Sequence, residues 1–318
     1  MSFDVTALGA YVEENADEFF SRAVLGAKVS SMMNRIDGVK SSIKLPTLDH
    51  GYDILQSDAN CSFNDGTNDL VIAQRTIDPI DMKIQEKYCI KDLEPYFTQK
   101  ILPAGSTYQS VPAELRLMDI LIERVNKVIE LMVVRGIAGG SSAIASFNLM
   151  DGMLETISND ITASDIPAAQ QLTGALTTTN VIGSFRAMYD ALPADNYNAT
   201  ASDGDWVIYC SPQTKATYNR DYQSDNGALV YNTTFGKGFL DDTGIEIIAL
   251  DGLREDTSQA ILTRKSNWWM GVDLDGEETN LSLTPGTGSE MHDLFLDGHF
   301  KMGIQTKFPD EMVVNNIS

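Results

Sequence analysis

The sequence has little cysteine and histidine, the side chains that build many metal sites and catalytic centres: three of each in 318 residues. Cys61, Cys89 and Cys210 are odd in number and far apart, and no Cys-x-x-Cys pair occurs. This pattern indicates neither a disulfide framework nor a zinc knuckle. Three free thiols suit a reducing compartment, so we expect the protein to be made in a cytosol.

Long apolar runs are also missing. No segment approaches the ~20 uninterrupted apolar residues that a membrane-spanning helix needs. The opening stretch, MSFDVTALGAYVEENADEFF, carries acidic side chains where a secretion signal carries basic ones. We therefore expect neither a membrane segment nor a signal peptide.

Positive charge is scarce. The chain has 23 basic and 45 acidic side chains, which gives a net charge of −22. Because such a surface repels nucleic-acid phosphates, sequence-specific binding of DNA or RNA is disfavoured. The length allows one large or two medium domains, and the apolar share of 43% is typical of a folded protein.

The motifs of common nucleotide-binding and hydrolytic sites are absent. The sequence has no Gly-x-x-x-x-Gly-Lys-Ser/Thr, no Gly-x-Gly-x-x-Gly and no Gly-x-Ser-x-Gly. Ser211 follows the apolar run 206–210, as a nucleophile does in some hydrolases, but Pro212 comes next. A Ser before a Pro is typical of a helix start, with the Ser as N-cap. We therefore predict that Ser211 caps a helix and that the chain has no catalytic residue.

Three further features are weak signals of a binding site. His292 and His299 are seven residues apart in an expected β segment and would face opposite sides of a strand, which disfavours joint metal ligation. The acidic stretch 272–278 lacks ligands that a calcium loop requires, and it favours a β-turn instead. Of the adjacent Trp268 and Trp269, one would face the core, which disfavours a sugar-binding platform. We expect no metal ion and no cofactor.

The basic residues gather near the N-terminus. Residues 22–44 contain five of them against Asp37 alone: Arg22, Lys28, Arg35, Lys40 and Lys44. In so acidic a chain this inversion of charge has two interpretations. The bases form either a solvated face or an arm that lies on an acidic neighbouring subunit.

Residues 41–85 have the pattern of a β-arm. Apolar and polar residues alternate at 43–45, and a stretch rich in Asp, Asn, Ser and Gly at 56–69 has the composition of a loop tip. A return strand begins at Leu70, and a second period-two pattern follows at 80–85. Together these pieces predict a long two-stranded arm with a loop at its tip.

The clearest element is a helix that Pro112 opens and Gly136 ends. Its apolar residues recur at steps of three and four and form one stripe. The stripe consists of Leu115, Met118, Ile122, Val125, Ile129 and Met132. We predict a single long helix that packs along this stripe, with a coiled-coil dimer as the alternative.

The second half of the chain predicts two kinds of structure. Helices and strands alternate first, which is typical of a compact α/β subdomain. The expected elements are a helix at 180–192, a strand at 205–210, a helix at 211–222 and a strand at 243–250. From residue 259 onward the chain is β-rich, and apolar residues alternate with polar ones at 300–307.

In this order, the parts resemble the major capsid protein of tailed bacteriophages, with the Hong Kong ninety-seven-like fold that also builds encapsulin shells. The resemblance covers nearly the whole chain and is carried by four stretches. They are TIDPIDMKIQEKYCIKDLEPY, RLMDILIERVNKVIELMVVRGIAGG with the later Gly152-Met153-Leu154, DWVIYCSPQTKATYNRDYQSDNGALVY, and LFLDGHFKMGIQTKFPDEMVV. They are similar to that family's extended loop, spine helix, axial domain and final strands.

The resemblance implies an α+β fold with an N-terminal arm, an extended β-hairpin loop, a long spine helix, a peripheral domain and an α/β axial domain. The implied division is 1–45 for the arm, 46–110 for the extended loop, 111–155 with 258–318 for the peripheral domain and 156–257 for the axial domain.

The implied function is structural. Many copies, as hexamers and pentamers, would close into an icosahedral shell around the double-stranded DNA of a tailed phage, without sequence-specific DNA binding. The protein would be a virion component made in the cytoplasm of a bacterial host. A separate scaffolding protein, a portal and decoration proteins are the expected partners.

Two details of assembly also follow from the resemblance. Acidic axial domains crowd around a capsomer axis, so bases from neighbours would offset their repulsion, and Lys215, Arg220 and Lys237 are candidates. Some family members join subunits by a Lys–Asn bond. Lys83, Lys87 and Asn315 form no convincing pair for that reaction, so we predict no crosslink.

Three alternatives stay open at this point. The first is an encapsulin-like shell around an enzyme cargo, and the second is a tail or connector protein of a phage. The third is a hydrolase built on Ser211 or on an acidic pair.

Overall fold

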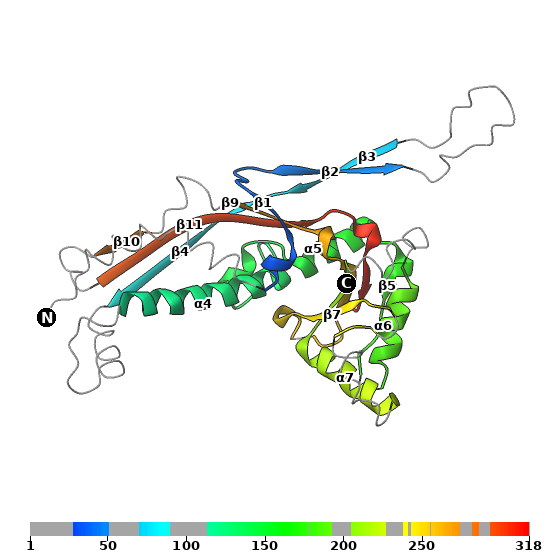
Figure 1. Ribbon diagram of the computed structural model, residues 1–318. Helices are drawn as coiled ribbons and strands as arrows, with labels where there is room; N and C mark the ends of the chain where they lie inside the picture. Colours follow the sequence, from blue (N-terminus) through cyan, green and yellow to red (C-terminus); the bar gives the residue numbers. More distant parts are fainter. Residues whose placement is uncertain are drawn as a thin grey trace, which may run out of the picture.

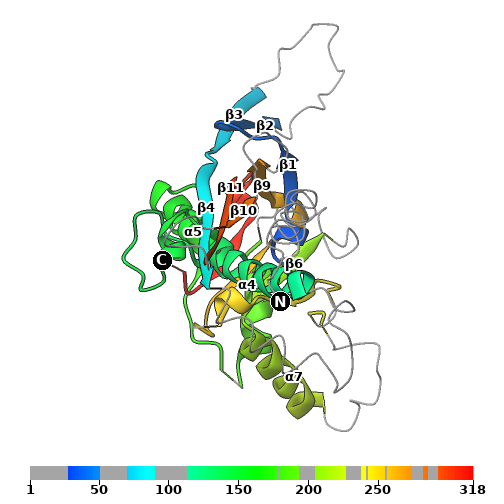
Figure 2. The same cartoon turned by 90° about the vertical axis from the view of Figure 1, so that its left-hand side faces the viewer.

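The computed structural model describes residues 28–50, 70–89, 113–177, 179–192, 205–226, 238–240, 243–254, 256–273, 282–285 and 293–317. In this part of the chain a long helix lies along a long β-sheet (Figure 1). A compact sheet with two helices lies at one end of this body. A two-stranded arm also projects from the body. Figure 2 shows the arm and the compact part at opposite ends of the molecule.

The long sheet is built around β11 (Asp293–Thr306), whose fourteen residues make it the longest strand in the described ranges. One edge of β11 pairs antiparallel with β4 (Ile80–Cys89), from Asp293 opposite Cys89 to Met302 opposite Ile80. The other strands are β10 (Ser282–Pro285), β9 (Trp268–Asp273) and β1 (Asn34–Asp37). β10 and β9 pair with the other edge of β11, and β1 extends the sheet parallel to β9.

The pairing of β4 corrects one prediction. The period-two pattern after residue 79 was expected to extend the two-stranded arm, but β4 pairs with β11 of the body. Met82 is buried at 5% exposure, and Ile80 and Ile84 pack against the main core. The pattern correctly indicated a half-buried strand, but alternation alone does not identify the partner strand.

The long helix is confirmed as α4 (Ala113–Arg135). Ile122, Ile129 and Met132 of the predicted stripe are buried, and Val125 packs against the same core. The side chains of Leu115 and Met118 lie outside the described residues. The core below the stripe includes side chains of the long sheet: Trp268, Met270, Leu296, Phe300 and Met302. The stripe therefore packs onto a sheet of its own chain, and this contact needs no second helix.

The end of α4 meets the start of α5 (Met153–Ala163) at two glycines. The Gly152 amide donates to the Gly136 carbonyl at 2.8 Å. A Cβ on Gly152 would lie 2.6 Å from the Gly136 nitrogen and 2.9 Å from the Met132 carbonyl oxygen. Both contacts are with backbone, which cannot move aside easily, so this crossing needs glycine.

The compact sheet confirms the predicted α/β subdomain. Its order is β5 (Gln171–Leu172), β12 (Val313–Asn315), β8 (Ala260–Arg264), β6 (Trp206–Cys210) and β7 (Glu246–Ala249). Two helices, α6 (Val181–Asp190) and α7 (Pro212–Asn226), contact each other. Phe185 of α6 and Tyr218 of α7 stack at 5.7 Å between ring centroids and share a second buried core with Ile208 of β6.

Sheet membership does not follow the predicted domain boundaries. β8 and β12 come from the stretch 258–318, which was assigned to the peripheral domain, but they lie at the centre of the compact sheet. The other boundary, at residues 155 and 156, falls inside α5. The chain therefore passes between the two sheets more than once, and the division into domains stays a prediction.

The N-terminal stretch 28–45 belongs in large part to the body. β1 pairs with β9, and Val29, Met33 and Val39 are each less than 9% exposed. A short 3-10 turn, η1 (Ser30–Met32), precedes β1. Residues 28–40 thus supply a strand and core side chains to the body, and the assignment of residues 1–45 to an arm stays a prediction. Residues 1–27 lie outside the described part of the chain.

Candidate assembly elements

The projecting arm consists of β2 (Ile43–His50) and β3 (Leu70–Ile77), paired antiparallel from Ile43 opposite Ile77 to His50 opposite Leu70. This pairing confirms the predicted two-stranded arm. Leu45 and Ile77 are buried near its base, whereas Ile72, farther out, is 69% exposed. The arm thus carries an uncovered apolar side chain away from the body.

The outer part of the arm is also strongly acidic in sequence. Residues 45–74 contain five aspartates and no Lys, Arg or Glu. Asp49 lies on β2, and the others lie within the connecting stretch 51–69, whose structure is outside the described ranges. The sequence of this stretch therefore carries a net negative charge.

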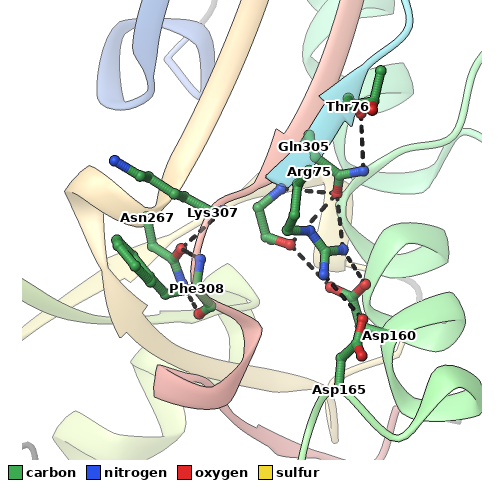
Figure 3. A network of polar contacts seen from close by, with 9 residues as sticks. Arg75, Thr76, Asp160, Asp165, Asn267, Gln305, Lys307 and Phe308 are labelled. Carbon is green, nitrogen blue, oxygen red and sulfur yellow. Dashed lines mark hydrogen bonds and ion pairs between the residues drawn. The ribbon is translucent and has the colours of Figure 1, made fainter. Parts of the chain in front are cut away.

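A polar network fixes the base of the arm to the body (Figure 3). Arg75 of β3 points its guanidinium at α5 and forms an ion pair with the Asp160 carboxylate there. The same guanidinium contacts Asp165 at 3.1 Å and the side-chain oxygen of Gln305 at 3.3 Å. Gln305 of β11 in turn donates to the Thr76 carbonyl at 3.3 Å. Arg75 thus joins the arm to α5 and to the long sheet at once.

Asp160 is the buried member of this network. Its side chain is 5% exposed, and its second carboxylate oxygen accepts from the Thr306 hydroxyl at 2.9 Å. Burial raises the pKa of Asp160, and the hydrogen bond and charge of Arg75 oppose that rise. The ionised carboxylate therefore depends on Arg75, because few other groups there replace the water that the side chain has lost.

A groove runs between α4 and the long sheet. Its volume is about 540 Å³. It is lined by residues 82–86 and Tyr88 of β4, by one face of α4, by Ser146 and Leu149, and by Phe300 of β11; the α4 residues are Ile120, Leu121, Arg124, Val125, Val128, Ile129 and Met132. Ile120 at its rim is 54% exposed, and Leu149 is 43% exposed. The Tyr88 ring also lines the groove, and burial raises the pKa of Tyr88 to about 12. The groove is therefore a largely apolar surface next to α4.

Two basic residues stand in the walls of the groove, Lys83 of β4 and Arg124 of α4. Both are exposed. Glu86 is the acidic residue among the lining side chains. The groove therefore combines exposed aliphatic side chains with a small excess of positive charge.

The basic residues predicted for assembly have varied surroundings. Lys28 donates to the Ala249 carbonyl at 2.8 Å, and Lys215 donates to the Ile247 carbonyl at 2.6 Å. Arg35 forms an ion pair with Asp37 on the same strand. Lys40 and Arg220 are exposed, while Arg22 and Lys237 lie outside the described residues. Neither the charge inversion nor the resemblance revealed that three of these bases have partners on their own chain.

Ser211 is a capping residue, as predicted. It is fully buried, and its Oγ accepts the Thr214 amide at 3.0 Å and lies 2.8 Å from the Thr214 hydroxyl. Burial also raises the pKa of the adjacent Cys210 thiol to about 12. Both side chains are fully buried where β6 ends and α7 begins.

The other features singled out in the sequence have structural roles or lie outside the described ranges. Trp268 is fully buried, as expected for one of the two tryptophans. Exposed His299 lies 3.4 Å from Asp297, while His292 and residues 274–278 of the acidic stretch 272–278 are not described. Among the described residues, no group of three or more side chains is arranged to hold a metal ion. None of the helices described is long and apolar enough to cross a membrane.

Two of the three crosslink candidates, Asn315 and Lys87, have partners within the chain. The Asn315 amide is 4% exposed and donates to the carbonyls of Gly174 at 3.0 Å and Ser258 at 2.7 Å. Lys87 pairs with Asp293 at 2.9 Å. Lys83 is exposed on β4. The Asn315 amide is therefore buried and bonded within its own chain, and the absence of a crosslink stays a prediction.

The Arg75 network was not predicted from the sequence, although the sequence does contain one indication that Arg75 is unusual. Residues 45–74 contain no Lys or Arg, so Arg75 is the first such positive charge after a long acidic stretch. A base at the foot of an arm can be singled out in this way. Its partner Asp160 cannot, because the two residues are 85 positions apart in the sequence.

Comparisons with known proteins identify the fold. No family model and no curated protein matches the chain. A chain of the satellite phage P4 procapsid, solved with its size-determination (Sid) protein, is similar at a TM-score of 0.60 and 9% identity, over 100% of this chain and 91% of that one. A capsid chain of an empty GTA particle is similar at a TM-score of 0.55 and 10% identity, over 93% and 89%.

A chain from Microbacterium phage Oxtober96 is similar at a TM-score of 0.54 and 12% identity, over 91% of this chain and 90% of that one. These identities are low, so the likeness concerns the fold. The protein has the α+β fold of phage capsid subunits, over almost its whole length. This confirms the predicted fold class and the resemblance on which it rested.

Proposed function

We propose that this chain is a major capsid protein that assembles into the icosahedral head shell around the double-stranded DNA of a tailed phage. The observation that carries the proposal is the projecting arm. A two-stranded hairpin is marginal by itself and needs a further apolar surface to pack against. An arm with Ile72 exposed at 69% is therefore built to be covered by another copy.

The groove between α4 and β4 is the surface that fits the arm. Exposed Ile120 and Leu149 offer apolar contact to Ile72, and Lys83 and Arg124 offer positive charge to the acidic outer arm. Because arm and groove are different surfaces of one chain, each copy donates one arm and receives another. Such head-to-tail contacts close into rings when the rotation between copies allows it.

The charge of the chain suits a container for DNA. A wall of subunits with net charge −22 does not grip phosphates, so packaged DNA stays mobile along it. Where acidic parts of several copies meet, bases such as Lys215, Arg220 and Lys237 would reduce the repulsion. A separate scaffolding protein, a portal and decoration proteins complete the proposed assembly in the bacterial cytoplasm. The proposed role is structural and involves no catalysis.

The experiment is electron microscopy of the full chain expressed in bacteria, with three single variants. Ile72→Asp changes the arm, Ile120→Asp changes the groove, and Ile144→Asp changes an equally exposed isoleucine outside the groove. We expect closed shells from the wild type and from Ile144→Asp, and unassembled folded subunits from the other two.

Different results would select other functions. Tubes or open rings from the wild type would indicate a tail or connector protein. Closed shells that enclose an enzyme instead of DNA in infected cells would indicate an encapsulin-like protein. A wild-type chain that stays monomeric and hydrolyses a substrate, with loss of activity in Ser211→Ala, would overturn the proposal altogether.

A further inference from the structure

Two short segments connect the long sheet to the compact sheet. The first runs from β8 through the 3-10 turn η8 (Lys265–Asn267) to β9. The second runs from β11 through η10 (Pro309–Glu311) to β12. Figure 3 shows Asn267 of the first segment next to Lys307 and Phe308 of the second. The two segments therefore cross between the sheets side by side.

Asn267 ties the two segments together through its side chain. Its oxygen accepts the amides of Lys307 at 3.1 Å and Phe308 at 2.6 Å. Its nitrogen donates to the Phe308 carbonyl at 2.7 Å and to the Thr263 hydroxyl at 3.0 Å. A side-chain amide has two donor hydrogens and two acceptor positions, and here all four are used. Asn267 is 1% exposed, so no water can replace these partners.

A second contact braces the same two segments. Arg264, at the end of β8, pairs with Glu311 of η10 at 3.4 Å. The Glu311 side chain is 14% exposed, and burial raises its pKa while Arg264 opposes the rise. The Arg264 guanidinium also lies over the Trp206 ring, 5.2 Å from its centroid. Arg264 therefore links η10 to Trp206 of β6 in the compact sheet.

Further segments converge on η8. The Lys265 amide donates to the Asp205 carbonyl, just before β6, at 2.9 Å. The Asn34 side chain, at the start of β1, donates to the Ser266 carbonyl at 2.6 Å. Strand ends from both sheets thus bind the same three residues. We call residues 264–267 together with 307–311 the joint.

We propose that the joint fixes the angle between the two sheets, and that Asn267 is the positioning residue that sets the curvature of the assembled shell. Only one relative position of the two segments satisfies all four hydrogen bonds of the buried amide, and an unsatisfied buried polar group is strongly disfavoured. The angle between the two sheets sets where each copy meets its neighbours. The angle between neighbours repeats around a closed assembly, so a fixed angle inside each copy gives a fixed curvature. This inference rests on the proposed function.

The test uses one isosteric change and one milder change. Asn267→Asp keeps the shape of the side chain but loses both donors and turns an oxygen toward the Phe308 carbonyl. Arg264→Gln removes the second brace and leaves Asn267 in place. Arg254→Gln, at an exposed arginine outside the joint, removes the same charge and serves as the control.

Two measurements are made on the full chain. Amide hydrogen exchange of dissociated subunits reports whether the joint has loosened, and cryo-electron microscopy reports the diameters of the closed shells. We expect exchange at Lys307 and Phe308 to be about tenfold faster in Asn267→Asp. We also expect its shells to have a shifted or broadened distribution of diameters. Arg264→Gln should change the exchange rates and the shell diameters in the same direction, but by less. Arg254→Gln should change neither quantity.

The outcomes separate the two proposals. Faster exchange in Asn267→Asp with wild-type shell diameters would show a purely structural role and overturn the inference. If Asn267→Asp does not fold, the same comparison in Arg264→Gln decides. A wild-type chain that forms no closed shell would instead overturn the proposed function, whatever the exchange data show.

Discussion

The guanidinium of Arg75 on β3 binds the buried carboxylate of Asp160 on α5, and this ion pair anchors the projecting arm to the body. Arg75 is 17% exposed and Asp160 only 5%, so the pair is largely withdrawn from water. A buried pair of this kind is costly to break on one side, since the remaining charge has lost both its partner and its hydration.

We therefore expect Arg75→Ala to destabilise the protein by about 3–5 kcal/mol. Arg35→Ala is the matched control, because Arg35 also pairs with an aspartate, but at 35% and 42% exposure for the two side chains. The control should cost no more than ~1 kcal/mol. Urea unfolding of both variants measures the difference. Equal losses would show that Asp160 is adequately solvated without Arg75.

The parts of the fold with local signals could be predicted from the sequence. The stripe of α4, the buried run of β6 and the Ser-Pro start of α7 each lie within one element, so periodicity and capping chemistry are sufficient. The partner of β4 could not be predicted, because alternation shows that a strand is half-buried but not which strand it joins. The crossing of β8 and β12 into the compact sheet was missed for the same reason.

The candidate site was less accessible to sequence reasoning than the fold. The local charge inversion singled out Lys28 and Arg35, and the family resemblance singled out Lys215. Neither shows whether a partner lies on the same chain or on a neighbour. Asn267 gave no signal at all, because a lone asparagine between two strands resembles any turn residue. Its role depends on Phe308, which is brought close only by the fold.

The burial of α4 predicts opposite results for two isoleucines on the same helix. Ile122 is 7% exposed in the main core, whereas Ile120 is 54% exposed. Ile122→Asp places an unpaired charge in the core, and we expect a loss of more than about 3 kcal/mol and no folded product. Ile120→Asp should stay within ~1 kcal/mol of the wild type. Soluble yield and thermal unfolding test this, and a well-folded Ile122→Asp variant would contradict the packing of α4.

The glycine crossing at the end of α4 predicts another matched pair. A Cβ on Gly152 would lie 2.6 Å from the Gly136 nitrogen, whereas a Cβ on Gly183 in α6 would meet no atom within 4 Å. We expect Gly152→Ala to cost ~1–3 kcal/mol, because backbone must shift. Gly183→Ala should stabilise the protein by ~0.5–1 kcal/mol, because it reduces the freedom of the unfolded chain. We expect the denaturation midpoint to fall below that of the wild type in Gly152→Ala and to rise above it in Gly183→Ala.

The two cysteines in the described ranges should differ in reactivity. The pKa of Cys210 is raised to about 12 by burial, so at pH 8 only about one thiol in ten thousand is ionised. Cys89, at the end of β4, is partly exposed. We expect a thiol reagent to label Cys89 in the native protein and Cys210 only after unfolding, as peptide mass spectrometry would show. Native labelling of Cys210 at the rate of Cys89 would contradict the buried position of β6.

The position of β1 predicts where the N-terminus can be cut. Deletion of residues 1–40 removes β1 and the buried side chains of Val29, Met33 and Val39. Each large buried aliphatic side chain contributes ~2–5 kcal/mol, and the sum is comparable to the whole stability of a domain. We expect this truncation to abolish folding, while deletion of residues 1–27 leaves a folded subunit that assembles less efficiently. Circular dichroism measures the loss of folding, and particle counts measure the loss of assembly. Equal melting temperatures for the two truncations would show that β1 contributes nothing to the long sheet.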